Sequence, residues 1–250
     1  MTVATLRRLA ALAFIGTATP VAAMDMKVVG DQLIMSGHVD GNELVKLRDV
    51  VADHGDRTIN TVILRDSPGG DLWTATRVGE YIRDKGWRTA VSGHCFSACA
   101  LMFLGGAERH FTDDKPALLT QIAFHAAYHT ADGLRSARGS NNPAASHRAR
   151  VWAKALSGGK LSDAMLDQFE KLDKTEFIHF FDARRMPRAG QPSVFLCSHA
   201  ISDPKQKCRP IPGTDAYAEG VVTTPVLLRS NDLPMRSGPK DASDTRDPAK

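Results

Sequence analysis

The chain has 250 residues, of which 42% are hydrophobic, and its 32 basic and 28 acidic side chains give a formal net charge of +4. This length suits one sizeable α/β domain. The small charge argues against a basic nucleic-acid-binding face. Every apolar run is shorter than the roughly 20 residues that a membrane-spanning helix needs.

The first 23 residues have the pattern of an export signal. Arg7 and Arg8 precede a short apolar core, and Val21, Ala22 and Ala23 form a small-residue cleavage site. We therefore expect a mature chain that begins at Met24 in the periplasm or outside the cell. Loss of the two arginines lowers the formal charge from +4 to about +2.

Strands and helices alternate in the first half of the chain. Apolar and β-branched runs predict strands over Lys27–Val29, Gln32–Ser36, Thr61–Leu64, Arg88–Val91 and Gln121–Phe124. Apolar residues at helical spacing predict helices over Gly41–Asp53, Leu72–Ile82 and Ala98–Leu104. This alternation indicates an α/β fold with a largely parallel sheet flanked by helices. Ligand-binding turns of such folds lie at the carboxyl ends of the strands.

The second half is less regular. Residues 130–146 have the composition of a mobile loop, and amphipathic helices are predicted over Arg148–Leu156 and Leu161–Lys174. The apolar segment "FIHFF" and a polar loop between Cys197 and Cys208 follow. We expect one domain over residues 24–228 and a disordered tail over 229–250, where almost nothing can be buried.

Four cysteines in an oxidising compartment favour pairing. Cys197 and Cys208 are predicted to form a disulfide that holds their polar loop. Cys95 and Cys99 are four residues apart, and on a regular helix this spacing gives poor geometry for a disulfide. They are therefore either buried thiols or a disulfide across an irregular turn. A metal site that includes His94 would lack a fourth ligand, and we expect neither a metal nor a cofactor.

Three segments carry residues suited to chemistry. In "SPGG", residues 67–70, glycines allow backbone N–H groups to approach a ligand, although such a segment, taken alone, more often forms only a tight turn. Ser97 lies between a strand and a helix, where a hydroxyl is either a nucleophile on a sharp turn or a helix cap. His125 ends an apolar strand, and a neutral imidazole can take the proton of an attacking serine.

In this order, "SPGGD", "GHCFSACALMFLGG" and "QIAFHAAY" resemble the ClpP/crotonase superfamily, and specifically its exported ClpP-like serine peptidases. The similarity runs from about Leu33 to His129 and resumes at "DAYAEGVVT". It implies a ClpP/crotonase-like fold and hydrolysis through an acyl-enzyme.

The resemblance also assigns roles to residues. Ser97 would be the nucleophile and His125 the general base, while Gly70 and Ala98 would supply oxyanion-hole amides and Gly69 would shape the turn. The expected acid aligns less cleanly. Asp173 and Glu176 lie closest to its place and rank equally, followed by Asp167 and Asp182.

The implied partners are flexible peptides or unfolded polypeptides, and other copies of the same chain in a homo-oligomer. A silent protein of the same fold that binds a peptide or a partner is the alternative. An acyl-CoA enzyme is a weaker third reading, because coenzyme A is not expected outside the cytoplasm.

Overall fold

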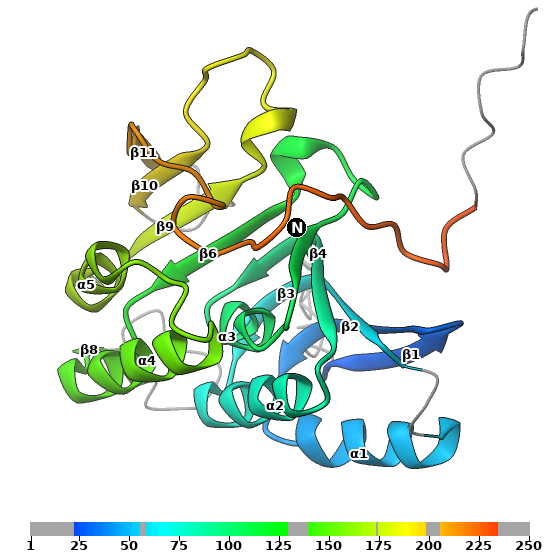
Figure 1. Cartoon of the computed structure of the whole chain (residues 1–250). Coiled ribbons are helices and arrows are strands. Elements are labelled where there is room, and N and C mark those ends of the chain that lie inside the picture. The colour runs from blue at the N-terminus through cyan, green and yellow to red at the C-terminus, as the bar shows by residue number, and fades with distance from the viewer. Residues whose placement is uncertain (1–22, 56–58, 130–139, 174, 199–205, 235–250) are drawn as a thin grey trace, which may run out of the picture.

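A nine-stranded sheet forms the centre of the computed structural model, which describes residues 23–55, 59–129, 140–173, 175–198 and 206–234 (Figure 1). The strands are β1 (Asp25–Val29), β2 (Gln32–Val39), β3 (Thr61–Gly70), β4 (Arg88–Phe96), β5 (Arg109–Phe111), β6 (Gln121–His125), β9 (Glu176–Phe181), β10 (Val194–Ser198) and β11 (Lys207–Pro210). Their order is β1-β2-β3-β4-β6-β9-β10-β11, and β5 pairs with β4. The predicted α/β class is confirmed.

Parallel pairing is confined to the middle of the sheet. Strands β2, β3, β4 and β6 pair in parallel, as do β4 and β5. Antiparallel partners extend this centre on both sides, with β1 at one edge and β9, β10 and β11 at the other. A separate two-stranded ladder joins β7 (Tyr128–His129) and β8 (Ser140–Asn141).

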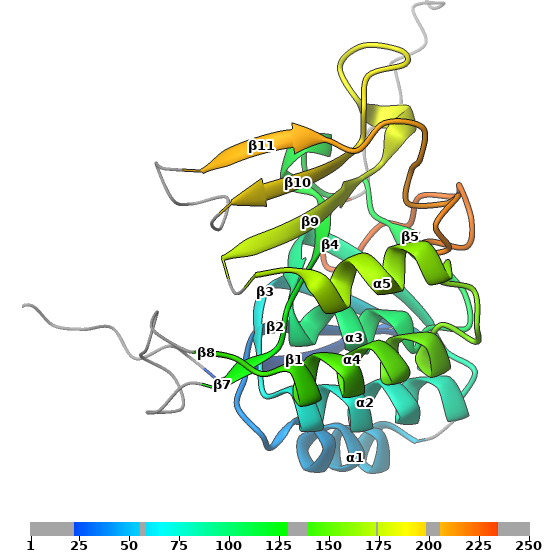
Figure 2. The ribbon, with the colours of Figure 1, turned by 90° about the vertical axis from the view of Figure 1, so that its left-hand side faces the viewer.

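Five α-helices gather along one side of the sheet (Figure 2). They are α1 (Glu43–His54), α2 (Leu72–Asp84), α3 (Ala98–Leu104), α4 (Pro143–Leu156) and α5 (Asp163–Lys171). Short 3₁₀ turns occupy Ala117–Leu119 and Ala183–Arg185. Helix α3 is buried at every residue, as its uninterrupted apolar sequence predicts. Within the described residues, no helix is both long and apolar enough to cross a membrane.

Side-chain caps decide where three of these helices begin. Asp71 accepts a hydrogen bond from the Thr74 amide at 2.7 Å, and Ser162 accepts one from Met165 at 3.1 Å. Asn142 does the same for Ala145 at 3.1 Å, with Pro143 in the first helical position. Helix α4 therefore starts at Pro143 rather than at the predicted Arg148.

A buried arginine fastens the C-terminal part of the domain to the core. Arg109 is 1% exposed, and its guanidinium donates to the carbonyl oxygens of Gly106, Gly220 and Val221 at 2.8 to 3.0 Å. Burial lowers the pKa of Arg109 to about 10. The segment "DAYAEGVVT" is thus held against the end of α3 by hydrogen bonds to main-chain oxygens.

The folded region continues past the boundary predicted at Leu228. Arg65 forms a two-pronged ion pair with Asp232 at 2.7 and 2.9 Å, and Ser230 is buried. This pairing holds Asp232 against β3, and Gln32 of β2 hydrogen-bonds to Arg229 and Asn231. The predicted signal up to Ala22, most of the predicted loop over 130–146 and the end of the predicted tail lie outside the described residues.

Candidate active site

Ser97 alone connects β4 to α3. Its backbone has φ 57° and ψ −123°, a combination that costs a non-glycine residue about 1–3 kcal/mol and persists only where the surroundings impose it. The Ser97 N–H donates to the Ala123 carbonyl, and the Ser97 carbonyl accepts from the Ala100 amide, both at 2.9 Å. Its hydroxyl makes no capping hydrogen bond to α3. The turn therefore presents the hydroxyl instead of using it as a helix cap.

The "SPGG" segment forms the end of β3 and packs against this turn. Gly69 has φ 91°, and a Cβ atom placed on it would lie 2.5 Å from the Phe96 carbonyl oxygen, 2.8 Å from Ser97 Cβ and 2.9 Å from the Ala98 nitrogen. A Cβ on Gly70, which has φ 143°, would lie 2.1 Å from the Val39 carbonyl oxygen. Only glycine allows these close approaches at such φ values. Gly69, Ser97 and Ala98 are thereby brought together.

A bulge in β3 sets the direction of this glycine segment. The pairing of β3 with β4 shifts register between Arg65 and Ser67, at Asp66, which has φ 45°. The Asp66 carboxylate contacts His94 Nδ1 at 3.3 Å and also pairs with Lys115. Burial acts to raise the pKa of Asp66, but the hydrogen bonds from His94 and Lys115 outweigh it and hold that pKa well below its ordinary value. No sequence pattern identified this cluster.

His125 ends β6, and the main chain sets its tautomer. Its Nδ1 lies 2.7 Å from the carbonyl oxygen of Ala126, which can only accept, so Nδ1 carries the proton and neutral His125 has its lone pair on Nε2. Its ring packs on Phe177 of β9 at a centroid distance of 4.8 Å. Burial lowers the pKa of His125, and the hydrogen bond to Ala126 opposes that shift.

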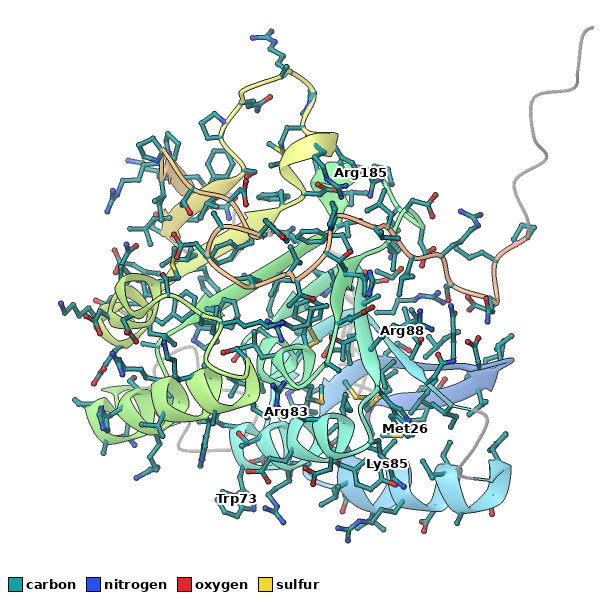
Figure 3. All side chains as sticks on the ribbon, viewed as in Figure 1. Met26, Trp73, Arg83, Lys85, Arg88 and Arg185 are labelled. Atoms are coloured by element: carbon teal, nitrogen blue, oxygen red, sulfur yellow. A yellow bond between two sulfur atoms is a disulfide. The ribbon has the colours of Figure 1, made fainter. Side chains whose placement is uncertain are left out.

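Ser97 and His125 line one small pocket of about 50 Å³. Most of its remaining lining is apolar and comes from α2, α3, α4, α5 and the end of β6, including Leu72, Leu101, Phe124, Ala126, Ala153 and Phe169. Arg150 also contributes, and its guanidinium pairs with Asp167 at 2.7 Å and with Glu170 at 3.2 Å. Beside the pocket, the exposed ring of Trp73 points away from α2 (Figure 3) and meets Trp152 edge to face.

The carboxylates predicted as the acid occupy different surroundings. Glu176 begins β9 and accepts a hydrogen bond from the amide of Asp173, which is exposed just after α5. Asp167 is engaged by Arg150, and Asp182 is buried and pairs with Arg184. His125 itself hydrogen-bonds to the Ala126 carbonyl, and its ring packs on Phe177. The acid stays a prediction.

All four cysteines are in disulfides. Cys197 pairs with Cys208, as expected, and the segment that contains them is a hairpin of β10 and β11 rather than a loop. Cys95 pairs with Cys99 across the Ser97 turn, whose irregular backbone is the condition under which this pairing was expected. His94 contacts Asp66 instead of completing a metal site with these sulfurs.

No protein-family model and no curated protein matches this chain. Solved structures similar to it include a membrane-bound stomatin-specific protease, with 14% identity, a TM-score of 0.42 and coverage of 55% of this chain and 66% of that one. ClpP1 from Listeria monocytogenes has 13% identity, a TM-score of 0.41 and coverage of 77% and 88%. A probable enoyl-CoA hydratase from Mycobacterium tuberculosis has 13% identity, a TM-score of 0.40 and coverage of 80% of this chain and 72% of that one.

The chain thus spans just under two thirds of the stomatin-specific protease structure. Proteases and a hydratase occur together among these similar structures. At such identities the similarity concerns the α/β fold and says nothing of activity.

Proposed function

We propose that this chain is an exported serine peptidase that cuts peptides or unfolded polypeptides through an acyl-enzyme. One observation carries the proposal: the strained Ser97 turn packs against Gly69, and Ser97 lines the same pocket as His125. Nucleophile, base and glycine segment, which lie far apart along the chain, meet at one place. Signal cleavage after Ala23 and self-association belong to the same proposal.

The proposed reaction begins when Ser97 Oγ attacks the carbonyl carbon of a peptide bond while His125 Nε2 takes its proton. The oxygen of the tetrahedral intermediate becomes negative and accepts hydrogen bonds from the amides of Ala98 and Gly70. In well-studied hydrolases, loss of one such donor costs about 3–4 kcal/mol. Collapse expels the amine, which receives the proton from His125, and water then cleaves the acyl-enzyme by the same steps.

Orientation of the base follows from the contact between His125 and Ala126. A triad carboxylate ordinarily accepts a hydrogen bond from Nδ1–H and fixes the tautomer. Here the Ala126 carbonyl accepts that hydrogen bond at 2.7 Å, so it would perform the orienting part of this role. A neutral carbonyl stabilises the imidazolium less than a carboxylate does. We therefore expect a modest turnover number.

The pocket favours a particular substrate side chain. Its small volume and mostly apolar lining suit a small apolar residue beside the scissile bond. The charge of Arg150 is balanced by Asp167 and Glu170, so this arginine provides little attraction for an acidic substrate.

A fluorophosphonate probe, which phosphonylates activated serines with loss of fluoride, tests the proposal. We expect the mature wild-type protein to be labelled, and we expect Ser97→Ala to remove both labelling and peptide hydrolysis with little change in thermal unfolding. Ser92→Ala is the matched control: Ser92 is buried on β4, the strand that leads into the Ser97 turn, it lies outside the pocket, and its hydroxyl has no hydrogen-bond partner within the described residues. This control should be labelled like wild type.

Labelling that persists in Ser97→Ala would assign the nucleophile to another residue. A wild-type protein that neither labels nor hydrolyses any peptide would support the alternative, a silent protein that uses the pocket for binding.

A further inference from the structure

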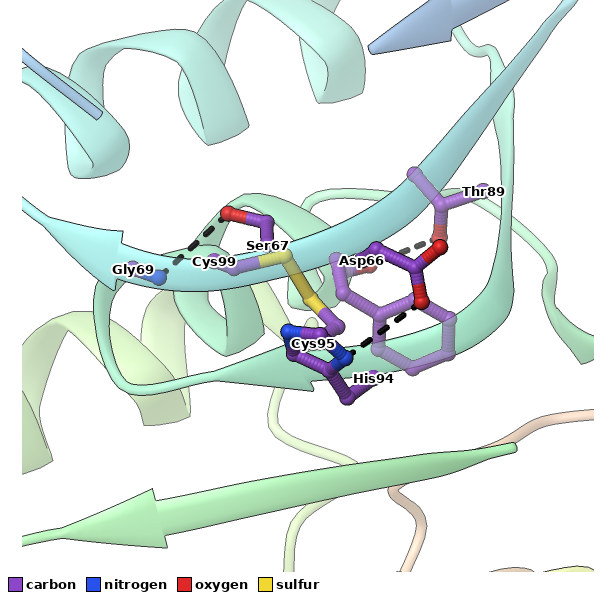
Figure 4. Close-up of a disulfide and its surroundings, with 8 residues drawn as sticks. Asp66, Ser67, Gly69, Thr89, His94, Cys95 and Cys99 are labelled. Carbon is purple, nitrogen blue, oxygen red and sulfur yellow. Dashed lines mark hydrogen bonds and ion pairs between the residues drawn. A yellow bond between two sulfur atoms is a disulfide. The ribbon is translucent and has the colours of Figure 1, made fainter. Parts of the chain in front are cut away.

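The Cys95–Cys99 disulfide encloses the Ser97 turn. Cys95 is the second-last residue of β4 and Cys99 the second residue of α3, so Ser97 lies midway between them. The two Cα atoms are 5.3 Å apart, and both cysteines are completely buried. Figure 4 shows the bridge beside the end of β3, with Ser67 and Gly69 close by.

One end of this bridge is anchored in the middle of the sheet. Cys95 pairs with Ser67 of β3 on one side and with Ile122 of β6 on the other. The other end lies in the first turn of α3, where neighbouring residues are also fully buried. The disulfide therefore ties the start of α3 to a fixed point on β4. The main chain between Cys95 and Cys99 must turn back within the 5.3 Å that separates their Cα atoms.

The enclosed residue has the conformation that needs such a constraint. Ser97 and Asp66 are the two non-glycine residues with positive φ in the described part of the chain. A return of Ser97 to negative φ would relieve strain. It would also redirect Oγ and the adjacent Ala98 amide, the two groups that the proposed reaction requires.

Global stabilisation is a weaker explanation for the bridge. A disulfide stabilises the folded protein mainly by constraining the unfolded chain, and this effect grows with the length of the loop it closes. Cys95 and Cys99 are separated by 4 positions, whereas Cys197 and Cys208 are separated by 11. The shorter loop constrains the unfolded chain less, and its effect falls on the local geometry of the turn.

We propose that the Cys95–Cys99 disulfide holds Ser97 in its positive-φ conformation, which makes Cys95 and Cys99 positioning residues for the nucleophile and for the Ala98 amide. The catalytic consequence rests on the proposed function. The conformational effect does not, and it can be measured separately.

The test compares the double variant Cys95→Ala/Cys99→Ala with Cys197→Ala/Cys208→Ala. The second removes a disulfide from the β10–β11 hairpin, whose cysteines do not line the pocket and of which Cys197 lies two strands from His125. Three quantities are measured: the rate of fluorophosphonate labelling, the melting temperature, and the three-bond coupling between the α proton of Ser97 and the carbonyl carbon of Phe96, which is large only when φ of Ser97 is positive. We expect the first variant to lose positive φ and to label about tenfold to a hundredfold more slowly. The hairpin variant should retain both the coupling and the labelling rate.

A second experiment uses reversible chemistry. The hairpin variant contains only the Cys95–Cys99 bridge, so it is reduced in denaturant, refolded with excess reductant and then reoxidised. Labelling should fall on reduction and return on reoxidation, while the far-ultraviolet circular dichroism stays that of the folded protein.

Three results would overturn the proposal. One is wild-type coupling at Ser97 without the bridge. Another is slow labelling with the coupling retained. The third is a reduced protein that does not fold, which would make the bridge a stability element. If wild type is not labelled at all, the proposed function fails, but the coupling still decides whether the bridge sets the Ser97 conformation.

Discussion

The Ala126 carbonyl controls the chemistry of His125 at the scale of single residues. It accepts a hydrogen bond from Nδ1–H and leaves Nε2 to act as a base. Burial, the larger influence, lowers the pKa of the imidazole. Because a general base must be neutral, the active form of His125 should persist at a pH below the ordinary histidine value of 6.5.

We therefore expect the acid limb of the kcat/KM profile to have its midpoint below pH 6.5. Asp173→Asn and Glu176→Gln should leave this midpoint and the turnover number close to wild type, because the carbonyl already holds Nδ1. The measurement is the pH profile of peptide hydrolysis for the three proteins. A large fall in turnover for one of the variants would identify that residue as the acid.

The contact between the end of β3 and the β4–α3 turn is the decisive feature at the scale of elements. Gly69 belongs to one and Ser97 to the other, and no space for a Cβ atom exists between them. The glycine therefore fixes how closely the two elements approach. It also determines where the Gly70 and Ala98 amides lie relative to the nucleophile.

Gly69→Ala should destabilise the domain by about 3–5 kcal/mol, because the new methyl group meets the Phe96 carbonyl oxygen and Ser97 Cβ. Gly86→Ala is the control, since Gly86 also has positive φ (66°) but its Cβ would meet nothing within 4 Å. It should cost only the backbone strain, about 1–2 kcal/mol. Urea unfolding and probe labelling of both variants test this. If Gly69→Ala and Gly86→Ala lowered the free energy of unfolding equally, the close contact of Gly69 with Ser97 would contribute nothing to stability.

Burial of His179 makes the stability of the whole molecule sensitive to acid. His179 is completely buried on β9, where Nδ1 contacts the Gln121 side-chain oxygen at 2.9 Å, and burial lowers its pKa from 6.5 to about 4. Between these two pH values the unfolded chain binds a proton at His179 that the folded chain does not. Stability must therefore fall as the pH is lowered through this window, and His125, whose pKa is also lowered, acts in the same direction.

His179→Asn can keep a hydrogen bond to Gln121 without adding a proton. The free energy of unfolding of the wild type should drop by about 3 kcal/mol between pH 6.5 and 4 through His179 alone. Urea titrations at several pH values should give a shallower decline for the variant. Parallel curves for the two proteins would refute this role of His179.

Local patterns located the helices and the parallel strands β2, β3, β4 and β6, because their apolar residues follow the period of the element that buries them. They missed the parallel strand β5 and the first turn of α4. Pairing with distant segments decided the rest. Strand β3 continues through "SPGG" because β2 and β4 pair with it there, and residues 229–234 are ordered because Arg65 binds Asp232. Ser97 and His125 could be selected from their positions after strands, whereas the Ala126 contact depends on a side-chain orientation that no sequence spacing encodes.

The C-terminal segment also has a consequence for how the chain reaches its native state. The Gln32 side chain donates a hydrogen bond to the carbonyl of Arg229, which lies 197 positions further along the chain. Arg109 donates to the carbonyls of Gly220 and Val221, at separations of 111 and 112 positions. Until those residues are available, a nascent chain leaves a charged guanidinium without its partners in what will become the core. Such long-range closure slows folding. Gly220, Val221 and Arg229 must therefore be present before the core around Arg109 and Gln32 can close.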